Sequence, residues 1–267
     1  MIIPFHKYQG AGNDFVLIDN RSERYKLNSQ DVAALCHRKF GVGADGLILL
    51  ENGNQSVDFS IRYFNSDGSE ASFCGNGTRC AVAFAHRLQI ISETCRLKAY
   101  DGIHTAAILE HRLQQYTIAL KMNDVNEVVQ YDTGFFLDTG SPHFVVFLKD
   151  HIADFDVVKE GKRLRDDPRF PDGCNVNFVQ CYRDGIYVRT YERGVEDETL
   201  SCGTGVTASA IVWALKNNYP DGAHIINVYT QGGNFKIEFT KTGQRFSDIK
   251  LIGEAIDVFE GTFTTEV

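Results

Sequence analysis

Residues 73–86, FCGNGTRCAVAFAH, contain a motif that returns in residues 201–215, SCGTGVTASAIVWAL. Each copy reads Cys-Gly-x-Gly and then continues into small and apolar residues. The glycines allow a tight turn and the residues after them favour helix, so each copy predicts a cysteine at the start of a helix. We expect these helices over residues 79–88 and 206–216. Both should be buried, because they are apolar on nearly all sides.

The spacing of the two motifs indicates an internal duplication. Cys74 and Cys202 lie 202 − 74 = 128 residues apart in a chain of 267 residues. Two other pairs of similar segments, around Arg62 and Arg189 and around Phe15 and Phe144, have offsets of 127 and 129 residues. Offsets that recur in chain order favour two similar halves. We therefore predict two domains, residues 1–121 and 122–251, with the terminal segment 252–267 returning to the first.

Strand-like segments dominate both halves, with one conspicuous apolar helix in each. Short alternating segments bounded by glycine, asparagine and aspartate recur along the chain. Further helices are expected at 28–40, capped by Asn28 or Ser29, and near 155–164. The predicted fold class is α+β, with two similar pseudo-symmetric domains. Each would be an antiparallel β-sheet or barrel wrapped around a central helix.

Composition excludes several classes of protein. The net charge of −8 argues against a basic surface that would bind nucleic acid. The hydrophobic fraction of 43% is ordinary for a soluble globular protein. The first residues lack the pattern of a signal peptide, and the longest uncharged stretch near Trp213 is too short and polar to span a membrane. We expect a soluble cytoplasmic protein without a nucleic-acid or membrane partner. Seven cysteines, an odd number, argue against a disulfide framework.

A cysteine at a helix N-terminus has a defined chemistry. Backbone N–H groups and the positive end of the helix dipole stabilise a thiolate or hold a bound carboxylate. The dipole contributes about 0.3–2 kcal/mol to an anion, so a thiol with an ordinary pKa near 8.5 moves to about 7. Such a thiol is partly ionised near neutral pH and can act as a base.

Other readings of these residues remain open at this stage. Cys74 and Cys80 could belong to a thiol redox or metal-binding protein, although the Cys-x5-Cys spacing lacks the paired ligands of a structural zinc site. His143 could be an ordinary turn histidine, and Glu192–Arg193 a surface ion pair. Residues 41–46, GVGADG, lack the Lys-Ser/Thr ending of a phosphate loop.

Four ordered motifs together resemble the diaminopimelate epimerase family. They are GAGNDF at 10–15, FNSDGSE leading to CGNGTRC at 64–80, Pro142-His143, and YERG leading to CGTG at 191–205. The resemblance covers nearly the whole chain. It implies a homodimeric isomerase that needs no cofactor or metal and interconverts LL- and meso-2,6-diaminopimelate in lysine and peptidoglycan precursor biosynthesis. It also implies a two-base mechanism in which Cys74 and Cys202 act as thiolate base and thiol acid on opposite faces of the α-carbon.

The same resemblance implies the residues that bind the substrate. The positions that match the family's substrate-binding residues are Asn13, Asn65, Gly75, Asn76, Asn175, Glu192, Arg193, Gly203 and Thr204. Arg193 suits a distal carboxylate and Glu192 an ammonium group, while asparagine can bind both. His143 matches a residue that assists proton transfer.

The chain departs from the family pattern in three places. Ser141 stands where many relatives have asparagine, Gly46 replaces a polar contact of some relatives, and the acidic loop 195–201 is one residue longer than the commonest form. Acidic side chains turned toward Cys202 would oppose its ionisation, but a solvated loop is the simpler expectation. The alternative enzyme of the same fold is a proline racemase or hydroxyproline epimerase, which would need a pocket for one carboxylate and a ring.

Overall fold

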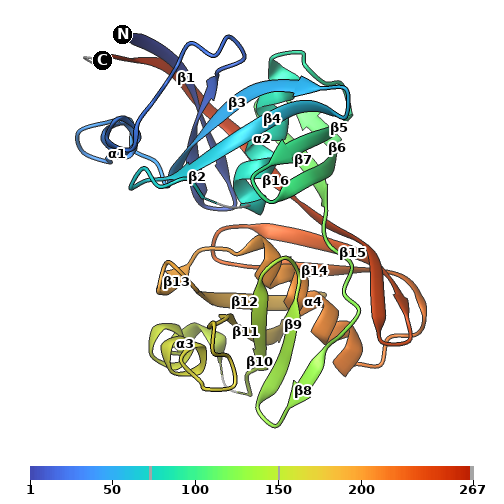
Figure 1. Ribbon diagram of the computed structural model, residues 1–267. Coiled ribbons are helices and arrows are strands. Elements are labelled where there is room, and N and C mark those ends of the chain that lie inside the picture. Colours follow the sequence, from blue (N-terminus) through green and yellow to red (C-terminus); the bar gives the residue numbers. More distant parts are fainter. Residues whose placement is uncertain (72–73, 150, 265–267) are drawn as a thin grey trace. The chain divides into compact units, whose positions relative to one another are not determined.

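The structure is a computed structural model that describes residues 1–71, 74–149 and 151–264. It divides into two compact units, the first comprising Met1–Leu120 with Gly253–Val267 and the second Lys121–Ile252. The long strand β16 (Arg245–Thr264) contributes its first part to the second unit and its last part to the first. Figure 1 shows the elements of both units.

The first unit is a closed barrel of eight described strands. In addition to the end of β16, it contains β1 (Ile2–Gly10), β2 (Asn13–Asp19), β3 (Gly46–Asn54), β4 (Val57–Asn65), β5 (Thr94–Ala99), β6 (Gly102–Arg112) and β7 (Gln115–Lys121). The hydrogen-bonded order runs from β1 to β7 and then to β16, and β16 pairs with β1, so the row closes on itself. This last pairing places the two chain ends side by side (Figure 1).

The second unit repeats this plan. Its strands are β8 (Val129–Tyr131), β9 (Gly134–Asp138), β10 (Pro142–Phe147), β11 (Asn175–Tyr182), β12 (Gly185–Glu192), β13 (Asp197–Thr199), β14 (Gly222–Tyr229), β15 (Asn234–Thr242) and the start of β16. The order is β16-β15-β14-β12-β11-β10-β9-β8, with β13 paired to β12 beside this row. A single bridge between Val125 and Phe246 joins the segment before β8 to β16 at the other end of the row.

Helices connect neighbouring strands at equivalent places in both units. The helices are α1 (Ser29–Cys36), α2 (Gly75–Arg87), α3 (Val157–Arg165) and α4 (Gly203–Lys216), with a 3-10 turn at Ile152–Asp154. They connect the parallel pairs β2/β3, β4/β5, β10/β11 and β12/β14, whereas the other pairs of the two rows are antiparallel. The predicted fold class is confirmed, but the sheets are mixed rather than purely antiparallel. A helical crossover brings the chain back in the same direction, which makes the joined strands parallel.

The central helices begin earlier than the sequence predicts. Both α2 and α4 start at the glycine directly after the cysteine, because the glycines of the motif adopt helical conformation themselves. Residues 76–85 of α2 are all buried, and α4 is buried almost throughout. The first helix is shorter than expected: a capping box of Asn28 and Asp31 starts it, and it ends at Cys36.

Glycine at the third helical position allows α4 to approach its sheet closely. A Cβ atom on Gly205 would lie 2.3 Å from Oδ1 of Asn177, a fully buried side chain of β11. A Cβ atom on the equivalent Gly77 of α2 would lie 3.0 Å from Cδ1 of Ile48, the far end of a flexible side chain. The duplicated motif therefore has a strict packing requirement in the second unit and a weaker one in the first.

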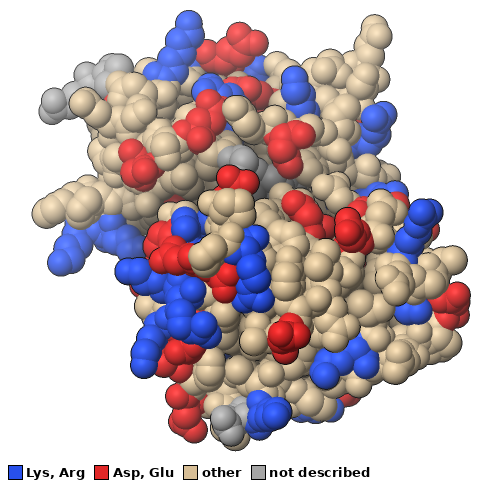
Figure 2. Space-filling model, turned by 60° about the horizontal axis from the view of Figure 1, so that its bottom comes forward, with Lys and Arg blue, Asp and Glu red and all other residues tan. Residues whose placement is uncertain are grey.

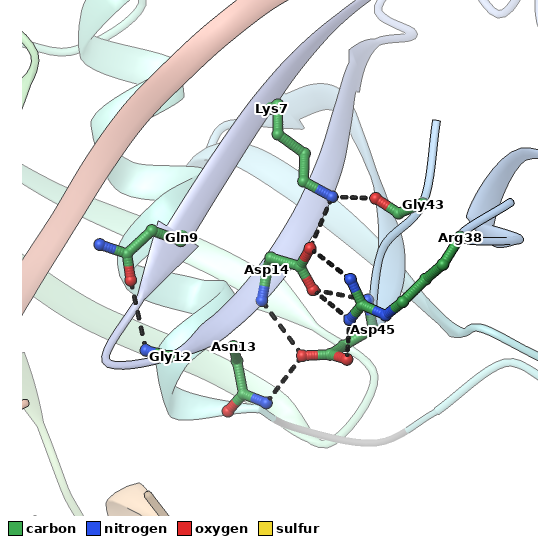
Figure 3. A network of polar contacts seen from close by, with 8 residues as sticks. All are labelled: Lys7, Gln9, Gly12, Asn13, Asp14, Arg38, Gly43 and Asp45. Carbon is green, nitrogen blue, oxygen red and sulfur yellow. Dashed lines mark hydrogen bonds and ion pairs between the residues drawn. The ribbon is translucent and has the colours of Figure 1, made fainter. Parts of the chain in front are cut away.

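A chain of alternating charges joins β1, β2 and the segment between α1 and β3 in the first unit (Figure 3). Nζ of the buried Lys7 donates to the Gly43 carbonyl and lies 2.8 Å from Oδ2 of Asp14. Arg38 binds Asp14 through both terminal nitrogens and reaches Asp45 at 2.6 Å. Burial alone would raise the pKa of Asp14, but the hydrogen bonds from Arg38 and Lys7 outweigh burial, and the net pKa lies well below its usual value.

Charged side chains of both signs are interspersed on the face drawn in Figure 2. Local ion pairs of the second unit include Arg163 with Glu160 and Arg169 with Asp167. Across the described residues, no helix has the length and apolar character needed to cross a membrane.

We predict that Gly205→Ala destabilises the protein and that Gly77→Ala does not. The added methyl group in Gly205→Ala would collide with Asn177 and lower the free energy of unfolding by about 1–3 kcal/mol. In Gly77→Ala the helix propensity of alanine offsets a mild contact, so the change should stay within about 1 kcal/mol. Urea unfolding followed by circular dichroism measures both, and Trp213 on α4, the only tryptophan, reports the second unit. Equal losses in the two variants would contradict the packing difference.

We also predict that Asp14→Asn destabilises the protein at neutral pH and much less in acid. The variant leaves the buried Lys7 without its carboxylate, which should lower the free energy of unfolding by about 2–3 kcal/mol at pH 7. Because the folded pKa is depressed, this stabilisation is present above the unfolded pKa of about 3.9 and is lost as the pH falls below it. Urea unfolding at several pH values measures the difference.

Asp19→Asn is the matched control for Asp14→Asn, because Asp19 lies on the same strand. It pairs with Arg21, and both side chains are about one-third exposed. Its loss should stay within about 1 kcal/mol. A difference between Asp14→Asn and wild type that stays constant from neutral to acidic pH would contradict the assigned ionisation.

Candidate active site

Cys74 and Cys202 occupy the same position on duplicated helices. Each is the N-cap residue, with φ and ψ of −127° and 112° at Cys74 and −127° and 115° at Cys202. Cys74 is partly exposed, whereas Cys202 is 8% exposed, with Sγ 3.4 Å from the Thr204 hydroxyl. The N–H groups of the first helical turn, which includes Gly75, Asn76, Gly203 and Thr204, have no acceptor within their own helix. Both cysteines therefore lie beside backbone donors that suit an anion.

Asn13 and Asn76 are in direct contact in the first unit. Nδ2 of Asn76 donates to Oδ1 of Asn13 at 2.6 Å, and Nδ2 of Asn13 donates to Oδ2 of Asp45 at 3.1 Å. Figure 3 shows Asn13 at the tip of the β1–β2 hairpin, beside Asp45. The hairpin residue and the first turn of α2, which are 63 residues apart in sequence, are thus held together.

Asn65 lies on an exposed turn of the first unit at the end of β4. Its Nδ2 donates to the Ser69 hydroxyl at 3.2 Å, so its amide faces its own turn. A separate cavity of about 10 Å³ lies beside Cys74 and is lined mainly by apolar residues such as Ile48, Ile61 and Ala99. It has room for about one water molecule and is too small for an amino-acid substrate.

His143 is fully buried in the second unit, and its hydrogen bonds define its tautomer. Nδ2 of Asn177 donates to the Phe144 carbonyl at 3.3 Å and lies 3.0 Å from Nδ1 of His143, while the Thr190 hydroxyl donates to Oδ1 of Asn177. Nδ1 of His143 is therefore the acceptor, and Nε2 carries the hydrogen. Burial, and secondarily the charge of Arg193, lower the pKa of His143 to about 3. Nε2 is buried and has no hydrogen-bond partner among the described residues.

Asn175 is buried at the start of β11 and binds two neighbouring segments. Its Nδ2 donates to the Ser141 hydroxyl at 3.0 Å, and its Oδ1 accepts from the Arg193 backbone N–H at 2.9 Å. Ser141, one of the departures from the family pattern, thus orients Asn175. The Arg193 side chain is exposed and donates to the Asp172 carbonyl at 3.1 Å.

Glu192 ends β12 and is held by the neighbouring strand β13. Its Oε2 accepts from the Thr199 hydroxyl at 2.9 Å. Burial raises the pKa of Glu192, and the bond from Thr199 opposes this rise only in part. Glu192 is therefore more easily protonated than an ordinary surface carboxylate.

The acidic loop before Cys202 is ordered by ion pairs rather than simply solvated. Glu198 binds Arg189 through two bonds of 2.6 Å, and Arg189 also donates to the Ile152 carbonyl. Glu196 pairs with Arg165 at 3.0 Å. These contacts compensate the charges of Glu196 and Glu198, and the bond between Arg189 and Glu198 fixes β13 against β12.

The sequence did not predict three supporting residues. Asn177 orients His143, Thr190 orients Asn177, and Thr199 holds Glu192. The position of Asn177 could have been predicted, because it lies two residues after Asn175 and therefore on the same face of the strand. Those of Thr190 and Thr199 could not, since their roles depend on the register of β12 with β11 and β13.

Comparisons with known proteins agree with the duplicated architecture. The family model described as diaminopimelate epimerase matches this chain twice, over residues 5–134 and 135–256. The diaminopimelate epimerase of Flavobacterium psychrophilum is 48% identical over 260 residues, which cover 96% of this chain and 98% of that protein.

Solved structures of low sequence identity share the fold. A phenazine biosynthesis protein of the PhzF family from Bacillus anthracis has a TM-score of 0.76 and 14% identity, and the match covers 99% of this chain and all of that one. A probable proline racemase from Agrobacterium radiobacter has a TM-score of 0.71 and 14% identity, over 99% of this chain and 93% of the other. The double match of the family model and the 48% identity over nearly the whole length confirm the resemblance seen in the motifs: the chain belongs to the diaminopimelate epimerase family.

Proposed function

We propose that this protein interconverts LL- and meso-2,6-diaminopimelate without a cofactor, using Cys74 and Cys202 as its two acid/base groups. The observation that carries the proposal is the placement of two cysteines with the same backbone conformation at the starts of duplicated helices. Membership of the family supports the substrate and the reaction. A cytoplasmic homodimer is part of the proposal and rests on the family resemblance alone.

The proposed reaction is a balanced transfer of two protons. One cysteine thiolate takes the proton from the α-carbon, and the electron pair of the broken C–H bond remains on the carbon and its carboxylate. The other cysteine thiol then gives its proton to the opposite face of the same carbon, which inverts the centre. The thiol and thiolate have exchanged roles at the end, so the return reaction uses the same groups in reverse.

Preorganised donors must stabilise the carbanion, because an α-proton of an amino acid is only weakly acidic. The first-turn N–H groups of α2 and α4 are suited to hold the reacting carboxylate, as oxyanion donors do. His143 is neutral with its hydrogen on Nε2, so in this proposal it assists as a hydrogen-bond donor and not as an imidazolium acid.

The distal amino-acid group of diaminopimelate distinguishes this substrate from a cyclic imino acid. Asn175, Glu192 and Arg193 lie at adjoining ends of β11 and β12. An exposed guanidinium beside a buried amide and a carboxylate suits a carboxylate with an ammonium group. This grouping favours diaminopimelate over the alternative of a proline racemase or hydroxyproline epimerase.

A thiol redox or metal-binding function through Cys74 and Cys80 is disfavoured by the position of Cys80. That side chain is fully buried within α2, and burial raises the pKa of its thiol far above the usual value. A buried neutral thiol is a poor nucleophile and a poor metal ligand.

We predict that Cys74→Ser and Cys202→Ser abolish inversion. Wild type in D2O should incorporate deuterium at the α-carbon of LL-diaminopimelate and form the meso isomer without added pyridoxal phosphate. Each variant should lose at least about 10³-fold in kcat for inversion, because a hydroxyl is a far weaker acid than a thiol. NMR of the α-hydrogen and chiral chromatography measure the two events. Cys181→Ser, at an exposed cysteine on β11, is the control and should retain wild-type rates.

Two outcomes of this experiment would contradict the proposal. Inversion that survives in either variant would exclude the two-base assignment. A wild-type protein that leaves diaminopimelate unchanged but racemises proline would support the alternative substrate class.

We further predict that Arg193→Met weakens turnover of diaminopimelate. Loss of a charged hydrogen bond to the distal carboxylate should reduce kcat/KM by about 10- to 100-fold. Arg183→Met, at an exposed arginine of the β11–β12 hairpin, is the matched control and should change kcat/KM little. Steady-state kinetics with both variants measures the difference. A wild-type kcat/KM in Arg193→Met would remove Arg193 from the distal site.

A further inference from the structure

Arg79 is a positively charged side chain in the interior of the first unit. It lies on α2 between Thr78 and Cys80, within the run of buried residues 76–85, and it is 0% exposed. It is among the largest fully buried side chains of the described residues. A guanidinium keeps its proton in proteins, so the centre of this barrel contains a permanent cation. The proposed transfer of two protons does not involve this side chain.

The guanidinium of Arg79 reaches back to the first turn of α2. Nη1 lies 3.3 Å from the Gly75 carbonyl, and Nη2 donates to Oδ1 of Asn76 at 2.7 Å. Nε donates to the Glu254 carbonyl at 3.4 Å, while the side chain of Glu254 is exposed. The three acceptors named here are neutral oxygens, and two of them belong to the residues that directly follow Cys74.

The second unit has no charge at the equivalent position. Arg79 follows Cys74 by 79 − 74 = 5 residues, and Thr207 follows Cys202 by 207 − 202 = 5 residues. The Thr207 hydroxyl donates to the Gly203 carbonyl at 2.9 Å, so it occupies the place of the guanidinium bond to Gly75 without its charge. The first turns of α2 and α4 therefore share backbone geometry, and the two helices differ by one buried positive charge.

We propose that Arg79 is a positioning residue that makes Cys74 the thiolate and Cys202 the thiol in the resting enzyme. The guanidinium binds the two residues that directly follow Cys74, and a buried cation near a titrating group favours the anionic form of that group. The inference rests on the proposed function, since only a two-base mechanism requires one cysteine to be ionised while the other is protonated. It adds which of the two cysteines holds the proton before the substrate binds.

A thiolate near Arg79 also affects the pKa of the guanidinium. Burial lowers the pKa of the guanidinium, and negative charge on Cys80 or Cys74 raises it again. Of these two thiols, Cys80 is fully buried and stays protonated, whereas Cys74 is partly exposed at the helix start. Cys74 is thus the group that can provide the negative charge.

Other titratable groups near Cys74 do not oppose this assignment. Tyr63 from β4 and Tyr100 after β5 line the small cavity at Cys74, and no carboxylate is among the described residues that line it. The neighbouring carboxylates, Asp14 and Asp45, are bound to Lys7 and Arg38 at the β1–β2 hairpin. Within α2 itself, the charged residue nearest to Cys74 in sequence is Arg79.

Arg79 also fixes the orientation of the side-chain amides of Asn76 and Asn13. Arginine can only donate, so it holds Oδ1 of Asn76 toward itself and turns Nδ2 of Asn76 toward Asn13. At the other end, the carboxylate of Asp45 can only accept, so it receives Nδ2 of Asn13. With a donor at one end and an acceptor at the other, neither amide can flip. A neutral substitute for Arg79 would loosen this order as well as remove the charge.

The test is the pH dependence of alkylation of Cys74 and Cys202 in the free enzyme. Iodoacetamide reacts with thiolates, so the rate at each cysteine, measured by mass spectrometry of its peptide between about pH 5 and pH 10, gives an ionisation midpoint. In wild type, Cys74 should have the lower midpoint. In Arg79→Gln, which keeps an N–H donor for Asn76 but loses the charge, the Cys74 midpoint should rise by about 1–3 pH units.

Two controls separate charge from structure. Arg79→Lys keeps a cation and should leave the Cys74 midpoint near that of wild type, while the Cys202 midpoint should stay unchanged in both variants. Thr207→Val, at the equivalent position of α4, should move neither midpoint. Buried Cys80 is an internal reporter, because its alkylation would signal loss of the folded state.

The outcomes distinguish this inference from the proposed function, because alkylation needs no substrate. A Cys202 midpoint equal to or below that of Cys74 in wild type would overturn the inference, even if the protein exchanges deuterium into diaminopimelate. An unchanged Cys74 midpoint in folded Arg79→Gln would overturn it too. If Arg79→Gln does not fold, the wild-type midpoints still decide which cysteine is ionised, and a Cys74 midpoint in Arg79→Lys far from that of wild type would overturn the role of the cation.

Discussion

The burial of a helix inside each row of strands is the constraint on which the rest of the structure depends. α2 and α4 are covered along almost their whole length, so only their ends can meet a ligand. The first turn of a helix has N–H groups without internal acceptors, and these need a partner when the helix is buried. A ligand anion is one such partner. The barrel thus leaves the start of its helix as an end that can meet a ligand, and it gives the adjacent cysteine a fixed backbone.

Polar groups in the two interiors are ordered by hydrogen bonds that run across several elements. In the second unit, Asn177 joins β10 through the Phe144 carbonyl, β12 through Thr190 and α4 through its close approach to Gly205. A buried amide without partners would be strongly destabilising, so each of these bonds is needed once Asn177 is inside. The same amide then sets the tautomer of His143, which links the packing of the unit to its chemistry.

The repeated Cys-Gly-x-Gly motif predicted the two central helices, and its spacing together with two other pairs of similar segments predicted the duplication. The family required four ordered motifs together, and all of these features can be read from local sequence. The relative directions of the strands were harder to predict from the sequence. Each parallel pair flanks a helix, and a strand-helix-strand reading of residues 57–99 would have indicated it. The partners of the candidate site residues could not be read from the sequence. Arg79 contacts Glu254, which is 175 residues away, and only the closure of the barrel brings them together.

Gene duplication supplies two alike helix starts, but the proposed two-base mechanism needs their cysteines to differ in protonation at every moment. One thiol must be ionised while the other holds its proton, and two identical environments would leave that choice to chance. The helix ends cannot decide it, because Cys74 and Cys202 have the same backbone geometry. A difference must come from side chains that the duplicated halves do not share. Arg79 and Thr207 are such a pair, buried at equivalent positions on α2 and α4, and they differ by one positive charge.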